Sequence, residues 1–218
     1  RGTILRYSGG QWQKVASPTS TFLSSVYMLS ATEGWAVGPY DVLHYSGGVW
    51  TDSQPISELA SVAMVSAREG WAVGTETIAH YHNGAWTDLK PSTFSLLGMR
   101  LISVVMVSPR EGWAIGNRSE GEPVFLHYQN GQWQFIANPL ASDVSLTALG
   151  MVSPDEGWMM GNEGSASVIL HYTRKSGWVP VATPLKIVFY SISMISPTDG
   201  WAVGAQNNFV HYEDGAWC

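Results

Sequence analysis

The sequence Glu33-Gly34-Trp35-Ala36-Val37-Gly38 decides the fold, because the chain repeats it. It returns four times, at residues 69–74, 111–116, 156–161 and 199–204. Met159 and Met160 replace Ala and Val in the fourth copy, and Asp199 replaces Glu in the fifth. The Trp residues of successive copies lie 36, 42, 45 and 43 residues apart. A period of this length indicates a repeat architecture rather than a single special motif.

Each copy of the hexapeptide lies within a longer unit that has further fixed positions. A Met precedes each Trp by seven residues, at Met28, Met64, Met106, Met151 and Met194. A His-Tyr pair follows, beginning at His44, His80, His127, His171 and His211. A second Trp closes the unit, at Trp50, Trp86, Trp133, Trp178 and Trp217, and Trp12 is a sixth closing Trp. All eleven Trp are therefore repeat positions.

Four short strands are expected in each unit. The first is an apolar run whose near-continuous hydrophobicity predicts burial on both faces. We expect it at residues 25–29, 61–65, 103–107, 148–152 and 191–195. A turn ending in Glu-Gly follows, where the Gly is expected to supply a positive φ. The hexapeptide forms the second strand, and the His-Tyr pair ends the third.

The hairpin between the third and fourth strands has the strongest local signal. Gly47-Gly48 and Asn83-Gly84 are two-residue turns, and other units have equivalents. Such a turn places Tyr45 directly opposite Trp50, an aromatic pair that stabilises the hairpin by about 0.2–1 kcal/mol. In the fourth unit, residues 174–176 lengthen the loop by one residue and keep the same Tyr–Trp register.

These units predict an all-β fold, a β-propeller of five four-stranded blades. Solenoid repeats of this length need helices, and no segment has a helical apolar period longer than a turn or two. We place the blades at residues 22–53, 58–89, 100–136, 145–182 and 187–218, in a single domain that spans 1–218. Residues 1–16 match only the second half of a unit and form an N-terminal half-blade. The half-blade either helps to close the ring or marks the chain as a fragment of a six- or seven-bladed propeller.

The repeated residues also resemble a known group of proteins. The pattern Gly-Trp-Ala-Val-Gly, a loop, then Leu-His-Tyr-x-Gly-Gly-x-Trp is similar to the repeats of photosystem II assembly-factor-like propellers and of the wider group with Asp-box (BNR, sialidase-type) repeats. The resemblance covers essentially the whole chain. The Asp-box pattern is degraded here to Tyr-x-x-Gly-x-Trp, and the catalytic Arg triad and Tyr nucleophile of sialidases have no counterparts. The resemblance therefore implies the fold, and it does not imply enzymatic or photosynthetic function.

Composition excludes several classes of function. The net charge is −6 and the eleven basic residues are scattered, so a nucleic-acid partner is not expected. No apolar run approaches the roughly 18–20 residues that cross a bilayer, so membrane insertion is not expected either. The single cysteine, Cys218, excludes an internal disulfide. The chain begins at Arg1 in mid-repeat, and we expect that an upstream leader or segment has been removed.

The repeated polar residues are interpreted as scaffold. One His per blade cannot converge on a single ion, so we expect no metal site and no cofactor, and we expect the imidazoles to bond backbone or hydroxyl groups. The repeated carboxylates, Glu33 among them, are expected to bond turn amides, since a catalytic pair needs two convergent groups in different environments. The Met column is interpreted as packing, and His82, the one unrepeated His, as a solvated loop residue.

Function is therefore expected where the units differ. These differences lie in the loops between the second and third strands and in the loops between blades, which share one face of a propeller. The third blade has long loops and the densest unrepeated charge cluster, Arg118, Glu120 and Glu122. The candidate ligand-binding residues are Tyr40, Asp41, Glu76, Arg100, Arg118, Glu120, Glu122, Glu163 and Tyr190. Tolerated surface insertions would explain the same loops equally well.

The sequence favours a non-catalytic recognition or scaffold module, bacterial and extracellular or periplasmic, that binds a protein or a glycan through its loop-rich face. One alternative is a glycan-processing enzyme of the five-bladed type, which needs acidic residues to converge. Asp41, Glu76, Asp143 and Glu163 are the candidates for that role. Another alternative is an extracellular sensor domain. No catalytic residue is assigned.

Overall fold

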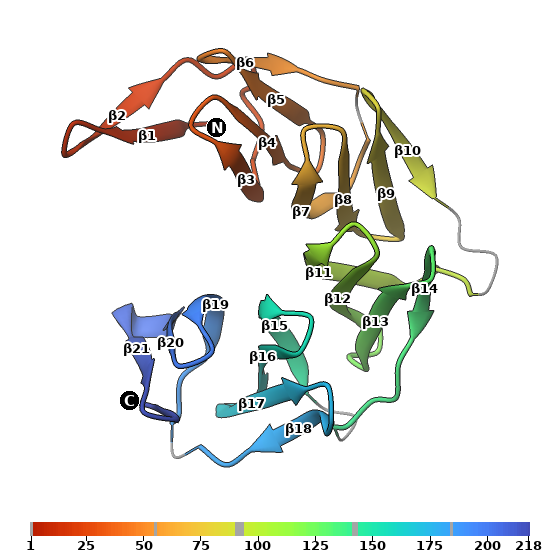
Figure 1. Ribbon diagram of the computed structural model, residues 1–218, viewed down its shortest axis with the longest axis vertical. Coiled ribbons are helices and arrows are strands. Elements are labelled where there is room, and N and C mark those ends of the chain that lie inside the picture. Colours follow the sequence, from red (N-terminus) through yellow and green to blue (C-terminus); the bar gives the residue numbers. More distant parts are fainter. Residues whose placement is uncertain (1, 55, 90–93, 141–143, 184) are drawn as a thin grey trace. The chain divides into compact units, whose positions relative to one another are not determined.

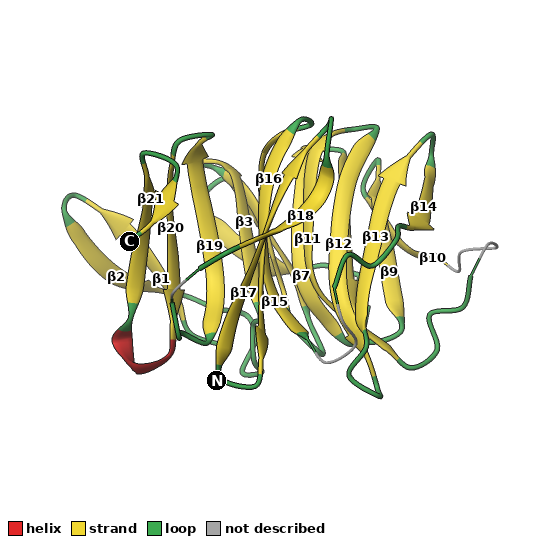
Figure 2. Ribbon diagram, turned by 90° about the horizontal axis from the view of Figure 1, so that it is seen from below, coloured by secondary structure: helices red, strands yellow, loops and turns green. Residues whose placement is uncertain are grey.

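The structure, a computed structural model, describes residues 2–54, 56–89, 94–140, 144–183 and 185–218. It confirms the predicted class: five four-stranded antiparallel sheets and one two-stranded sheet form an all-β propeller fold (Figure 1). The helical structure in the described residues is one short 3₁₀ turn, η1 (Ala205–Asn207), drawn in red in Figure 2. The described residues contain no helix of the length and hydrophobicity that would span a membrane.

The chain divides into two compact units, Arg1–Lys90 and Pro91–Cys218. The first unit holds the half-blade and two blades. The half-blade consists of β1 (Ile4–Ser8) and β2 (Gln11–Val15). Blade one consists of β3 (Ser25–Ser30), β4 (Glu33–Val37), β5 (Val42–Ser46) and β6 (Val49–Asp52). Blade two consists of β7 (Leu59–Ser66), β8 (Glu69–Gly74), β9 (Thr77–His82) and β10 (Ala85–Leu89).

The second unit holds three blades. Blade three consists of β11 (Met99–Ser108), β12 (Glu111–Arg118), β13 (Pro123–Gln129) and β14 (Gln132–Phe135). Blade four consists of β15 (Ser145–Ser153), β16 (Glu156–Glu163), β17 (Ala166–Thr173) and β18 (Gly177–Val181). Blade five consists of β19 (Phe189–Ser196), β20 (Asp199–Gly204), β21 (Phe209–Glu213) and β22 (Ala216–Trp217). In both units every blade is a simple meander, and its strands pair in sequence order. The prediction of one domain over 1–218, with the blade limits given above, stays a prediction.

The hairpin prediction is confirmed in all six copies. Tyr45 pairs with Trp50 across β5 and β6, and the six Tyr–Trp pairs have ring centroids 5.0–5.4 Å apart. Asn83 and Gly84 both have positive φ (49° and 97°), as a two-residue type I′ turn requires. Tyr172 still faces Trp178, so the longer loop of blade four leaves the register unchanged, as predicted.

Neighbouring blades within a unit are joined through the Trp of the second strand. Trp35 is fully buried, and its indole meets the ring of Tyr81 in the next blade at 5.5 Å between centroids. In the second unit, Trp113 meets Tyr172 at 5.4 Å and Trp158 meets Tyr212 at 5.0 Å. Because each of these Tyr residues also pairs with the closing Trp of its own blade, the aromatic rings form a continuous contact from one blade to the next.

The prediction that every first strand is buried on both faces is wrong for blades one and five. Val26 and Met28 on β3 are 61% and 45% exposed, whereas their equivalents Val62 and Met64 on β7 are 4% and 2% exposed. Within the first unit β7 packs against β3 and β4, so β3 has a packed neighbour on one side only. In the second unit β19 packs against β15 in the same one-sided way, and Ile195 on it is 68% exposed.

The first Gly of the hexapeptide, which follows the Glu, has a different role from the predicted one. Gly70 does not adopt a positive φ; it lies within β8, directly opposite Met64 on β7. A Cβ at Gly70 would collide with the Met64 sulfur, and all five copies share this arrangement. The turn itself is held by its Ser, since the Ser66 hydroxyl accepts a hydrogen bond from the Arg68 amide at 3.1 Å. The repeated Gly therefore lacks a side chain so that the sulfur of the repeated Met can pack against its backbone.

This arrangement predicts the outcome of a double-mutant cycle in blade two. Gly70→Ala should lower the free energy of unfolding by about 1–3 kcal/mol, because the new methyl overpacks the site of Met64. In a Met64→Ala background the same substitution should cost less than half as much, since the colliding sulfur is gone. Urea unfolding of the four proteins measures both costs. Equal costs in the two backgrounds would show that the Gly serves the backbone and not the Met.

Candidate functional site

The repeated carboxylate, imidazole and indole form one stack on the same face of each blade. In blade two, Glu69 lies opposite His82 and Trp71 lies opposite His80 across β8 and β9. The His80 ring stacks on the Trp71 indole with centroids 4.2 Å apart, and its Nε2 lies 2.5 Å from Glu69 Oε1. Blades one, four and five repeat the carboxylate–imidazole contact at 2.5–2.8 Å.

The expected partners of these repeated residues were wrong, because the carboxylates bond the His rings rather than turn amides, and the rings bond carboxylates rather than backbone or hydroxyl groups. The physical reason is the strand alternation: it places the first and third residues of the hexapeptide on one face, together with the His of the next strand. For Glu69, burial opposes ionisation, but hydrogen bonds from His82 and His80 outweigh it, so the pKa lies below its usual value.

Blade three departs from this pattern. Arg174, in the lengthened loop of blade four, reaches Glu111 of blade three with an N–O distance of 3.3 Å and also pairs with Asp155. The distance from Glu111 to His127 Nε2 is 3.4 Å, longer than in the other blades. Burial lowers the pKa of His127; Glu111 opposes this shift and Arg174 adds to it. The inserted loop residue is therefore an ion-pair link between two blades.

Two of the three predicted binding residues of the first unit, Asp41 and Glu76, have structural roles in connections between strands. The Asp41 carboxylate accepts hydrogen bonds from the hydroxyls of Thr19 (2.8 Å) and Thr21, which fastens the connection between half-blade and blade one. Glu76 has φ 54° and forms the tight turn between β8 and β9. Tyr40 is 63% exposed beside Asp41. None of these three residues is among the lining residues of the groove of this unit that is described below.

The predicted residues of the second unit belong to three blades. Glu163 is exposed at the end of β16, and Tyr190 is 62% exposed on β19. Arg100 is exposed on β11, where it pairs with Asn117, and Glu120 is exposed in the turn after β12. Asp143, one of the acidic residues considered for catalysis, lies outside the described residues.

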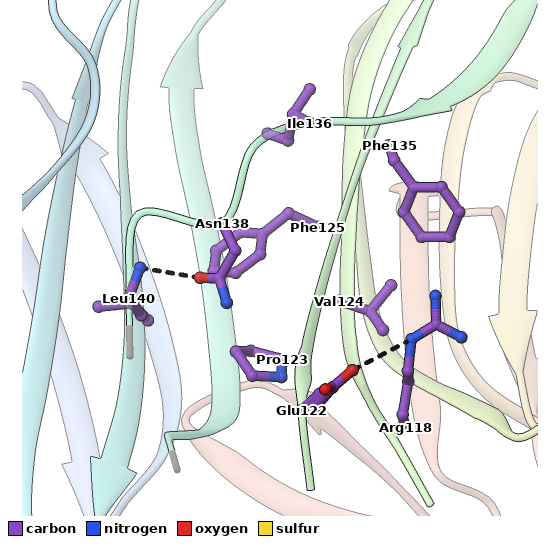
Figure 3. A pocket seen from close by; sticks show the side chains of 9 residues that line it. All are labelled: Arg118, Glu122, Pro123, Val124, Phe125, Phe135, Ile136, Asn138 and Leu140. Atoms are coloured by element: carbon purple, nitrogen blue, oxygen red, sulfur yellow. Dashed lines mark hydrogen bonds and ion pairs between the residues drawn. The ribbon is translucent and has the colours of Figure 1, made fainter. Parts of the chain in front are cut away.

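Arg118 and Glu122 are the two predicted residues that the structure brings together. They flank the turn after β12, where the Arg118 amide bonds the Glu122 carbonyl at 2.8 Å. Their side chains form an ion pair at 3.7 Å (Figure 3). Both line a cavity of about 370 Å³ at the loop end of blade three. The other seven predicted residues are absent from its described lining.

The cavity has an apolar body and a polar rim. Its further lining residues are Pro123, Val124, Phe125, Phe135, Ile136, Asn138 and Leu140. The Arg118 guanidinium lies 5.6 Å from the centre of the Phe135 ring, a cation–π distance. On the other side in Figure 3, the Asn138 side chain accepts a hydrogen bond from the Leu140 amide at 2.8 Å. A few polar groups around an apolar wall are the usual composition of a ligand site.

Phe135 is a lining residue of the candidate site that sequence reasoning missed. It lies two residues after the closing Trp, where blades one and two have Asp52 and Asp88. Phe135 is 42% exposed and packs on Phe94, with ring centroids 4.6 Å apart. The half-blade has Lys14 and blade four has Pro180 at this exposed position, so a large aromatic residue there was a readable signal.

A larger groove of about 760 Å³ lies in the first unit, between the half-blade and blade one. Its walls include the exposed rings of Tyr7 and Trp12 and the exposed side chains of Val26 and Met28. These are repeat positions, and their equivalents in blade two are buried between strands. The groove is therefore interpreted as an uncovered packing face, and the blade-three cavity is the candidate site.

The fold is shared with solved propellers of several functions. A structure described as YCF48 bound to D1 peptide matches with a TM-score of 0.70 at 20% identity, over 94% of this chain and 70% of that one. The extracellular domain of the hybrid two-component system BT4673 of B. thetaiotaomicron matches with a TM-score of 0.72 at 14% identity, over 97% of this chain and 29% of that one. A virginiamycin B lyase from Staphylococcus aureus matches with a TM-score of 0.71 at 11% identity, over 99% of this chain and 79% of that one.

These likenesses establish the propeller fold and leave the activity open, because all three identities are low. The chain spans less than a third of the sensor domain's length. Neither family models nor curated protein sequences give a match to this chain.

The largely buried His127 imidazole of blade three predicts a pH dependence of stability. Because the pKa of His127 is lowered in the folded protein, the unfolded chain binds this proton at a higher pH, near the usual pKa of about 6.5. Unfolding then takes up a proton below that pH, and the free energy of unfolding falls as the pH drops. Urea unfolding between pH 8 and pH 5 should show a smaller loss for His127→Gln than for the wild type. Parallel curves for the two proteins would contradict the assignment.

Proposed function

We propose that the chain is a non-catalytic recognition module that binds a segment of a partner protein in the blade-three cavity. The observation that carries this proposal is the cavity itself, which combines an apolar wall with one arginine from the unrepeated loop of blade three. Its volume of about 370 Å³ lies within the range of about 300–1,000 Å³ typical of ligand pockets.

The lining indicates the chemistry of the segment. Val124 and Phe125 are buried in β13 and form an apolar wall, which suits an aliphatic or aromatic side chain. The Arg118 side chain is 40% exposed and its pair with Glu122 is loose, so its guanidinium remains available to a carboxylate. An apolar residue next to an acidic residue, or next to a chain's C-terminal carboxylate, fits both features.

The structural comparisons support a binding role over catalysis. A propeller of the same fold is described with a bound D1 peptide, and another is the extracellular domain of a sensor. The lyase shows that the fold also carries enzymes. Our assignment of this chain to the non-catalytic class rests on its repeat positions, because the repeated carboxylates contact the repeated imidazoles within each blade. An extracellular or periplasmic location is part of the proposal.

The finer resemblance is part of the proposal as well. The repeats are similar to those of photosystem II assembly-factor-like and degenerate Asp-box propellers, in which the repeated residues form the blades. A glycan ligand is the alternative, since the partly exposed Phe135 ring offers a flat aromatic surface that can stack on a sugar.

Selection from a displayed library of random peptides tests the proposal. Binders should contain an apolar residue beside a carboxylate. Phe135→Ala should weaken the selected peptide by at least about fivefold, since an aromatic anchor contributes about 1 kcal/mol or more at a binding site. Arg118→Gln should weaken it about tenfold, because the carboxylate loses its charged partner.

Arg110→Gln is the matched control, since Arg110 is an exposed arginine of the same blade at the turn between β11 and β12. It should leave peptide affinity unchanged. A glycan array run with the wild type separates the two ligand classes. Peptides that bind equally well to Arg118→Gln and Phe135→Ala, or binding to the array alone, would contradict the proposal.

A further inference from the structure

Blade two contains a cluster of metal-ligating side chains that is independent of the blade-three cavity. Glu69, His80 and His82 each offer one ligand atom, and the three atoms lie within 4.8 Å of one another. Glu69 Oε1 lies 2.5 Å from His80 Nε2, and Glu69 Oε2 lies 2.8 Å from His82 Nδ1. The carboxylate therefore lies between two imidazoles.

The sheet explains why the three side chains converge. His80 and His82 are separated by one residue on β9, so they point to the same face of the sheet. Glu69 on β8 is the direct cross-strand partner of His82, and Trp71 is the direct partner of His80. All four side chains thus share one face, at the end of blade two that carries the β9–β10 hairpin. The small Ala85 lies opposite His82 on β10.

The other blades lack this triad although they repeat two of its members. In blade one, Ser46 is the partner of Glu33 where blade two has His82. In blade five the position holds Glu213, which approaches His211 Nδ1 at 3.4 Å, whereas Asp199 contacts the opposite ring nitrogen at 2.8 Å. The two carboxylates therefore lie on different sides of one imidazole. The convergence depends on His82, which the sequence interpretation treated as a solvated loop residue.

We propose that Glu69, His80 and His82 form a binding site for one divalent zinc ion. Two imidazole nitrogens and a carboxylate oxygen are zinc ligands, and a set of three protein ligands leaves a fourth position for water. Carboxylate and imidazole ligands held on adjacent strands need little rearrangement. Zinc–ligand distances of about 2.0–2.1 Å require ligand atoms roughly 3.3 Å apart, so the two Glu69–His contacts must open by less than about 1 Å. The most distant pair of ligand atoms, which lies within 4.8 Å, must close by up to about 1.5 Å.

The surroundings allow this opening at one ligand while they hold the others. The His80 ring is fixed by its stack on Trp71, at an interplanar angle of 15°. The His82 side chain is 63% exposed and can move outward. Its Nε2 lies 2.8 Å from the Asn83 side-chain amide, which can donate to this nitrogen or, turned over, accept from it. Asn83 can therefore support the tautomer that presents Nδ1 to the metal.

Zinc titration of the whole chain tests the site, by calorimetry and by the visible absorption of cobalt as a substitute ion. All proteins carry Cys218→Ser, because the exposed Cys218 thiol is itself a zinc ligand. The parent should bind one zinc ion. Glu69→Gln and His82→Ser should each weaken the affinity by at least about tenfold. His82→Gln should do the same, and it places in blade two the residue type found at Gln129 in blade three.

Blade one provides the controls. Glu33→Gln changes the equivalent carboxylate and should leave zinc affinity unchanged. Ser46→His should raise the stoichiometry from one ion to two, since Glu33 and His44 already lie 2.6 Å apart in the same register. Far-UV circular dichroism confirms that each variant is folded. Absence of saturable zinc binding by the parent, or unchanged affinity in the two His82 variants, would overturn the proposal.

Discussion

The indole of the second-strand Trp makes the contacts that join neighbouring blades within a unit. Trp35 has no exposed surface; it stacks on His44 of its own blade at 4.6 Å and meets Tyr81 of the next blade at 5.5 Å. The His is held in turn by Glu33, and the Gly between Glu and Trp leaves room for the Met sulfur. One hexapeptide therefore supplies the stacking, the ion pair and the close strand contact. Because these requirements are local, the loops can vary without loss of the blade.

The departures from this stack are informative because the stack is constant. Arg174 forms an ion pair with Glu111, whose contact with His127 is longer than its equivalents, and so links two blades. His82 adds a second imidazole to Glu69. Phe135 stands where blades one and two have Asp, and it lines a cavity with Arg118. Each change concerns one residue in one blade. Each adds a charged, metal-ligating or aromatic side chain at a position where the other blades do not have it.

The fold was predictable because its determinants are short-range and repeated. The Asn83-Gly84 turn and the alternation around it determine the register of a hairpin, and five copies determine the number of blades. The partners of the repeated polar groups were not predictable in the same way, since the Glu33–His44 contact depends on the pairing of two strands. For the candidate site, charge density in the loop identified Arg118 and Glu122. It did not identify Asn138, whose position depends on the course of the chain after the last strand of the blade.

The central claim is that repeated residues form the scaffold and that recognition lies in the unrepeated residues of blade three. Nuclear magnetic resonance of the chain with a selected peptide tests it most directly, through the side-chain signals of Arg118, Asn138 and Phe135. We expect these signals to shift on binding, while those of Tyr7, Trp12 and Met28 in the first-unit groove stay unchanged. Shifts confined to the groove would contradict it.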